Sequence, residues 1–224
     1  MDELVNNSRV VECILGLKTH TSRKSCLILA LQSARFHFGR DKKTGKGNIA
    51  DFYFRQKIMT EKEENVQLDR TEDEVDLFSG LILYLVVLEQ LGTIFINKNT
   101  NGILGILKLY ASDLLREERN AIKNLRNSLV HNHGLVACSP QGKPLCKFIL
   151  SFEENIKPVE LPIHDWTKKY EDKSEDSSIK INVFALINLI EEIIEKVIDE
   201  SISGKLVSKL SKDELESRFT ILFE

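Results

Sequence analysis

The sequence predicts a mainly α-helical protein, an antiparallel helical bundle with a small β element after its fourth helix. Apolar residues recur at spacings of three and four over most of the chain. The period changes to a strand-like pattern, bounded by turn residues, only after Gly134, and helical spacing returns near residue 180. With 224 residues, 42% of them hydrophobic, the chain is long enough for one sizeable core. We therefore expect 1–224 to form a single domain.

Two helices are predicted in the first half of the helical core. Apolar residues recur at helical spacing through 22–38, and Gly39 ends that helix. Polar, basic and glycine-containing residues at 41–48 predict a loop. The next helix is predicted at about 73–97. Its segment 77–88 carries no charge but is shorter than the roughly 18 to 20 apolar residues that cross a bilayer. It is therefore predicted to be a buried core helix.

The remaining elements are predicted from the same change of period. The helical core is expected to consist of about 20–133 and 180–203, and the β element to cover about 134–163. Strand-like segments on either side of a Pro- and Gly-containing turn predict a β-hairpin, and a third strand would extend it to a β-meander. In order, we predict helices at 102–110 and 113–133, strands at 135–138, 145–152 and 159–163, a charged loop at 168–178, an amphipathic helix at 182–201, and a short helix and strand in the tail from 211.

Composition limits the classes of function. The net charge is -3 and the sequence pI is about 6.0, so nucleic-acid binding must depend on a local basic surface. The four cysteines form no CxxC pair, and the acidic N-terminus lacks a secretion signal. We expect a cytoplasmic protein that does not enter a membrane. No His or Cys residues have metal-ligand spacing, and 39–47 lacks the Lys-Ser/Thr ending of a phosphate loop, so neither a metal nor a cofactor is expected.

The helix predicted at 113–133 separates apolar from basic residues. With about 100° of rotation per residue, Ala121, Ile122, Leu125 and Leu129 lie on one side, which is predicted to face the core. Asn127 lies beside the basic stripe on the other side, and His131 follows Asn127 by one turn. The basic stripe, a predicted RNA track, consists of Arg116, Arg119, Lys123 and Arg126, and His133 is predicted to extend it.

Arg126 and His131 together provide phosphate binding and proton transfer. A guanidinium can hold two phosphate oxygens through paired donors, and histidine is the side chain best suited to proton transfer near neutral pH. This chemistry suffices for metal-free RNA cleavage, in which the ribose 2′-oxygen attacks the adjacent phosphorus. Two proton transfers are needed, and one chain offers one well-placed histidine. A symmetric homodimer would place two arginines and two histidines around one phosphate.

The spacing Arg126-Asn127-x-x-x-His131 resembles the RNxxxH form of the motif found in the HEPN superfamily (higher eukaryotes and prokaryotes nucleotide-binding). The apolar helix before the motif and the amphipathic helix after it are also similar to that family, over roughly 70–200. The resemblance implies a HEPN-like helical bundle and a homodimeric, metal-independent endoribonuclease, often a toxin or a component of phage defence. Arg126 and His131 would be catalytic, with Asn127 supporting them, and an antitoxin or another regulatory protein would be a partner.

The resemblance leaves alternatives open. Some relatives that pair with a nucleotidyltransferase antitoxin carry a tyrosine two positions after the histidine, where this chain has His133. Other relatives have lost catalysis and bind RNA, a nucleotide or a protein partner. Arg126 would be structural if it paired with Glu195 or Asp199, and the basic stripe would then be a solvated face. Glu89, the only charge in the apolar part of its predicted helix from 77 to 97, either orients Arg126 or His131 or lies exposed at the helix edge.

Overall fold

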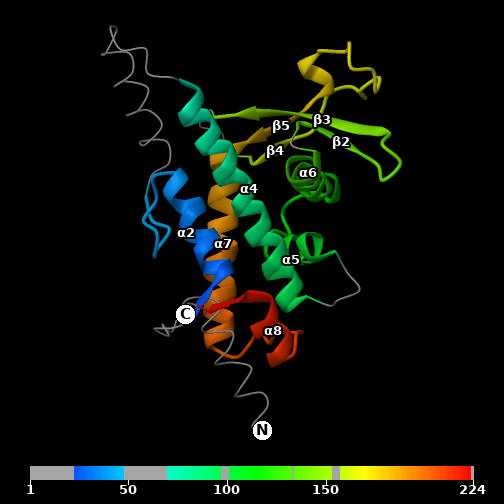
Figure 1. Ribbon diagram of the computed structural model, residues 1–224. Helices are drawn as coiled ribbons and strands as arrows, with labels where there is room; N and C mark the ends of the chain where they lie inside the picture. The colour runs from blue at the N-terminus through cyan, green and yellow to red at the C-terminus, as the bar shows by residue number, and fades with distance from the viewer. Residues whose placement is uncertain (1–22, 48–69, 97–100, 133, 153–156, 223–224) are drawn as a thin grey trace, which may run out of the picture.

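A long apolar helix, α4 (Arg70–Phe95), forms the centre of the fold. The computed structural model describes residues 23–47, 70–96, 101–132, 134–152 and 157–222. Figure 1 shows α4 crossing α7 (Val183–Ile202), with α2 (Cys26–His37) on one side of this pair and α5 (Gly102–Tyr110) on the other. The predicted helices at 73–97, 102–110 and 182–201 are thereby confirmed, with small shifts at their ends. The helix predicted at 22–38 begins only at Cys26, because Arg23–Ser25 form a strand.

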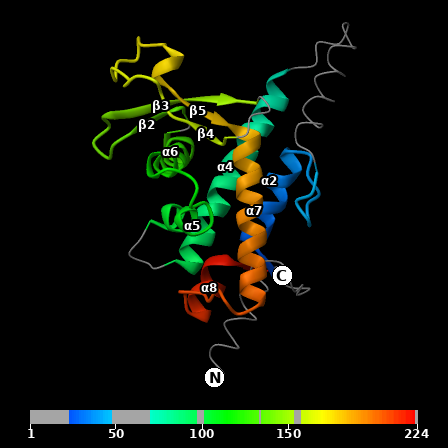
Figure 2. The same ribbon diagram turned by 180° about the vertical axis from the view of Figure 1, so that it is seen from behind.

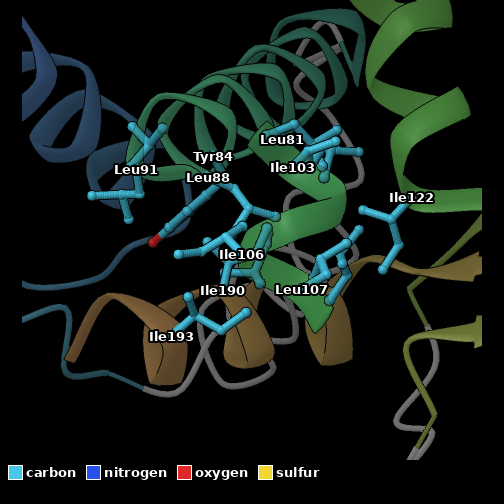
Figure 3. Close-up of a cluster of buried hydrophobic side chains, with 14 of the residues drawn as sticks. Leu81, Tyr84, Leu88, Leu91, Ile103, Ile106, Leu107, Ile122, Ile190 and Ile193 are labelled. Atoms are coloured by element: carbon cyan, nitrogen blue, oxygen red, sulfur yellow. The ribbon is translucent and has the colours of Figure 1, made fainter. Parts of the chain in front are cut away.

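The core forms where α4, α5 and α7 meet. Aliphatic side chains from the three helices interdigitate there, together with Tyr84 (Figure 3). The helices α4 and α5 approach closely at Gly92 and Gly102. A side chain at Gly92 would not fit there, because its Cβ would lie 2.0 Å from the Gly102 carbonyl oxygen. The labelled core residues in Figure 3 are Leu81, Tyr84, Leu88, Leu91, Ile103, Ile106, Leu107, Ile122, Ile190 and Ile193.

By length and composition alone, one described segment, Leu77–Phe95, could also cross a membrane. In the fold this segment is the inner part of α4, and Leu81, Leu85 and Leu88 on it are almost fully buried against neighbouring helices. The core helix of a globular domain passes the same test of length and hydropathy. Its burial therefore fits the core helix that the sequence predicts.

A four-stranded mixed sheet lies beside the helices (Figures 1 and 2). The predicted hairpin is confirmed: β2 (Val136–Cys138) pairs antiparallel with β3 (Pro144–Ser151). The predicted third strand exists as β4 (Val159–Glu160), but it pairs with β5 (Ile179–Asn182) instead of β3. Since β5 also pairs parallel with β3, the strand order is β2-β3-β5-β4. A β-meander is therefore wrong.

The sheet also corrects the predicted fold class, because the protein is mixed α/β and not a mainly α-helical bundle. The decisive strand is β5, which has only four residues and lies between a charged loop and α7. Ile179 and Ile181 on β5 are buried, and Lys180 between them is not. Parallel pairing needs a long crossover connection, so no local turn signal links β3 to β5.

A second, two-stranded sheet joins the two ends of the described chain. The strand β1 (Arg23–Ser25) pairs antiparallel with β6 (Thr220–Leu222). The helix α8 (Lys212–Phe219) precedes β6 and begins at a capping box, in which Ser211 and Glu214 bond to each other's backbone N–H groups. The short helix and strand predicted in the tail are thus confirmed.

Candidate functional site

The predicted motif helix changes type at the motif. The α-helix α6 covers Arg116–Asn127, and a π-helix, η1, continues it over Ser128–Asn132. The predicted core face is confirmed, because Ala121, Ile122 and Leu125 are buried. Single π-helical turns are rare and occur often at functional sites.

The π-helical turn decides which side chains meet. In an α-helix, residues five apart point about 140° away from each other, since each residue turns the chain by about 100°. In a π-helix the hydrogen bonds run from residue i to i+5, so residues five apart come onto the same face. Arg126 and His131 are five apart, and their side chains touch. The regular helix assumed from the sequence instead placed His131 below Asn127.

Arg126 is the centre of a group that we call the motif cluster: Arg126, Asn127, His131 and Glu89. Arg126 Nη1 donates to His131 Nε2 at 2.9 Å and to Asn127 Oδ1 at 3.2 Å. Arg126 Nη2 forms an ion pair with Glu89 on α4. Arg126 Nε is buried and has no hydrogen-bond partner among the described residues. The structure thus brings together the three predicted catalytic residues and the predicted orienting residue.

The contact with Arg126 fixes the role of the His131 ring nitrogens. A guanidinium has donors only, so His131 Nε2 must accept and carries no proton in this arrangement. The ring proton of neutral His131 is then on Nδ1. A lone pair for proton transfer therefore lies beside the cationic group that would bind a phosphate.

The exposure of the cluster is uneven. His131 is exposed, whereas the Arg126 and Glu89 side chains are only 14% and 19% exposed. A phosphate can reach these groups only if they face solvent and are not fully held in ion pairs. His131 faces solvent, whereas Arg126 is only partly available, because Glu89 already holds one of its terminal nitrogens. The alternative partners Glu195 and Asp199 are exposed on α7, and the carboxylate that pairs with Arg126 is that of Glu89.

The residues of the predicted RNA track have different roles in the structure. Arg119 Nη1 donates to the carbonyl oxygens of Leu114 at 2.6 Å and Ala111 at 3.4 Å, so this side chain satisfies backbone groups just before α6. Arg116 is exposed and Lys123 half-buried, and neither has an ion-pair partner among the described residues. His133 lies outside the described residues.

The sheet supports the end of the motif helix. Ser128 is fully buried, and its hydroxyl donates to the Gly134 carbonyl oxygen at 2.6 Å, which fixes the exit from the π-helix toward β2. Asn124 on α6 faces Cys146 on β3, with 4.0 Å between Nδ2 and Sγ. Burial raises the pKa of the Cys146 thiol to about 11, so it carries little thiolate near neutral pH.

Sequence reasoning missed a second polar group, which we call the buried cluster: Arg35, Glu191 and Tyr84. Arg35 Nε and Nη2 donate to the two carboxylate oxygens of Glu191 at 2.9 and 2.7 Å. The Tyr84 hydroxyl donates to Glu191 Oε1 at 2.6 Å. Glu191 is 6% exposed, although a carboxylate on an amphipathic helix is expected on the solvent-facing side. Its burial could have been inferred from the sequence, because it lies at helical spacing among Ile187, Ile190 and Ile194.

The electrostatics of the buried cluster are those of a satisfied structural ion pair. Burial by itself lowers the pKa of Arg35, but the hydrogen bonds and the charge of Glu191 outweigh it, and the net shift is upward. Burial, with the Glu191 charge, raises the pKa of Tyr84 well above its usual value. Arg35 therefore stays charged and Tyr84 stays neutral over a wide pH range.

Comparisons with protein-family models, with curated proteins and with solved structures found no match to this chain. Among the described residues, no three His, Cys, Asp or Glu side chains are grouped so as to hold a metal ion. The geometry of the motif cluster therefore carries the functional argument.

Proposed function

We propose that this protein is a metal-independent endoribonuclease that acts as a homodimer, with Arg126 and His131 as its catalytic residues. The observation that carries the proposal is the 2.9 Å contact between Arg126 Nη1 and His131 Nε2, with His131 exposed to solvent. Asn127 and Glu89 position the guanidinium from two sides. The RNxxxH resemblance supports the same residues, although the HEPN-like bundle does not describe the fold as a whole.

In the proposed reaction, a phosphate of the RNA replaces His131 as the partner of Arg126 Nη1. His131 Nε2 is then free to accept the proton of the ribose 2′-hydroxyl. The 2′-oxygen forms a bond to phosphorus, the bond from phosphorus to the 5′-oxygen breaks, and the departing 5′-oxygen receives a proton. The products are a 2′,3′-cyclic phosphate and a 5′-hydroxyl. Arg126 stabilises the additional negative charge on the phosphate oxygens.

The second proton transfer needs a second group. A neutral His131 that acts as base cannot at the same moment donate the proton to the 5′-oxygen. In a two-fold symmetric dimer, the protonated histidine of the second copy takes this role. Cleavage activity is therefore expected to fall faster than protein concentration once the dimer dissociates.

The test is RNA cleavage by the purified protein in EDTA. We expect products with cyclic phosphate ends, and His131→Ala is expected to lower the rate by about 10²- to 10⁴-fold, the usual contribution of a proton-transfer group. The matched control is His164→Ala, which removes an exposed histidine outside the motif cluster. Cleavage that needs a divalent metal, or that survives His131→Ala, would contradict the proposal.

The ion pair between Arg126 and Glu89 favours a second candidate, a non-catalytic module that binds RNA, a nucleotide or a protein partner. An arginine already paired with a carboxylate is less available to a phosphate. This candidate predicts RNA binding without cleavage, with binding weakened by Arg126→Ala. Growth arrest on overexpression of the wild type, but not of His131→Ala, would favour the nuclease and a role as a toxin or defence effector.

A further inference from the structure

The loop after α2 gives the protein a second surface with the chemistry of RNA binding. Residues 39–47, which we call the basic loop, hold four cationic side chains and one carboxylate in a chain whose net charge is -3. The exposed members are Lys42, Lys43 and Lys46. None of the three forms an ion pair with a carboxylate among the described residues. The basic loop is thus a local positive surface on an acidic protein.

Hydrogen bonds to neighbouring side chains hold the backbone of the basic loop in place. Arg35 Nη1 donates to the carbonyl oxygens of Lys42 at 3.2 Å and Lys43 at 2.7 Å, and Arg40 Nη1 donates to that of Gly45 at 2.6 Å. Asp41 Oδ1 accepts from the backbone N–H of Thr44 at 2.7 Å and that of Lys43 at 3.1 Å. These bonds leave the lysine side chains on a preformed loop, which lowers the entropy cost of binding.

The same bonds exclude a phosphate loop. Such loops bind phosphate through backbone N–H groups, whereas here Asp41 occupies two of these groups and the carbonyl oxygens face Arg35 and Arg40. Hydrogen bonds from Thr44 hold the pKa of Asp41 below its usual value, so its charge stays inside the turn. Phosphate binding on this loop must therefore use the lysine ammonium groups. An extended polyanion suits such spaced charges.

An aromatic ring lies beside the lysines. Phe36, in the last turn of α2, is 58% exposed although it is a large apolar side chain. Lys42 Nζ is 4.4 Å from the centre of its ring. An exposed ring next to lysines is the combination that binds single-stranded nucleic acid, because bases stack on the ring while lysines contact the phosphates. A membrane surface would require more exposed apolar residues on the loop.

This surface lies apart from the motif cluster. Figures 1 and 2 show α2 and its loop on one side of α4 and α7, with α6 on the other side. We propose that Phe36, Lys42, Lys43 and Lys46 form a binding surface for single-stranded RNA, separate from the motif cluster. The surface goes beyond the proposed nuclease site, because it binds RNA without taking part in cleavage.

The experiment measures fluorescence anisotropy of a labelled 2′-O-methyl RNA of about 12 nucleotides, a length within the range of single-strand binding sites. This RNA has no free 2′-hydroxyl and stays intact with the wild-type protein. We expect Lys42→Ala/Lys43→Ala/Lys46→Ala to weaken binding about tenfold or more and to reduce the salt dependence of log K by about 2, since each lost phosphate contact lowers the slope by about 0.7. Phe36→Ala is expected to weaken binding roughly tenfold without changing this slope, and Phe36→Tyr to retain binding.

The matched control is Lys205→Ala/Lys209→Ala/Lys212→Ala, which removes the same charge from exposed positions around α8. Equal binding by the wild type and the loop variant, or equal losses in the loop and control variants, would overturn the proposal. The replaced side chains make none of the bonds that hold the loop, and matching thermal melts will verify folding. His164→Ala, outside both the motif cluster and the basic loop, is expected to bind this RNA like the wild type. Absence of cleavage with loop-dependent binding would contradict the nuclease proposal alone.

Discussion

The motif cluster and the buried cluster contain similar residue types, but they differ in exposure and in whether the arginine has polar atoms available to a ligand. Each joins an arginine to a glutamate of a neighbouring helix and to a third polar side chain. In the buried cluster, Arg35 is 4% exposed, and each of its three guanidinium nitrogens donates to Glu191 or to a loop carbonyl group, in four hydrogen bonds. In the motif cluster, Arg126 lies against an exposed histidine, and its Nε has no partner among the described residues.

The difference separates a structural ion pair from a candidate binding group. A buried guanidinium with a partner on each of its nitrogens can take up a ligand only by giving up bonds that hold the fold. An arginine with weaker burial and a titratable, exposed neighbour can exchange one partner for a phosphate. The two glutamates should therefore respond differently to the same substitution.

The largest expected effect is on stability. Glu191→Ala leaves the Arg35 charge buried and unpaired, so we expect it to lower the free energy of unfolding by about 3–5 kcal/mol. Glu89→Ala removes a more exposed partner and is expected to cost about 1–2 kcal/mol. Urea denaturation of both variants provides the measurement. Equal losses would show that the two ion pairs have the same structural role.

Sequence reasoning found the motif cluster more completely than the buried cluster. Arg126 and His131 are close in sequence, so one helix brings them together, and only the π-helical turn changed which residues meet. Arg35 and Glu191 are 156 positions apart, and only the packing of α2 against the central helices joins them. The parallel strand β5 was missed for the same reason, because its partner lies across a long connection.

Gly45 tests how tightly the basic loop covers the buried cluster. Its φ is +67°, and an added Cβ would lie 2.5 Å from Glu191 Oε2 and 2.8 Å from Arg35 Nη2. We expect Gly45→Ala to lower the free energy of unfolding, measured by urea denaturation, by about 2–4 kcal/mol. About 1–2 kcal/mol of this loss comes from the left-handed backbone conformation. Gly142→Ala is the matched control, because Gly142 has a φ of +75° and no atom within 4 Å of an added Cβ. If both substitutions lower the free energy of unfolding equally, the basic loop does not pack tightly against the ion pair.

The smallest effect concerns the pH dependence of stability. The pKa of Tyr84 is raised above its usual value of 10.0, by burial first and then by the Glu191 charge. A raised pKa means that the folded protein resists ionisation, so this stabilisation is complete below about pH 10 and is lost as the pH rises further. Between about pH 10 and pH 11, the free energy of unfolding should fall by up to about 1.4 kcal/mol more in the wild type than in Tyr84→Phe. Tyr170→Phe removes an exposed phenol and serves as the control. Parallel pH profiles for the wild type and Tyr84→Phe would mean that water reaches the buried cluster, and the contrast with the motif cluster would then be lost.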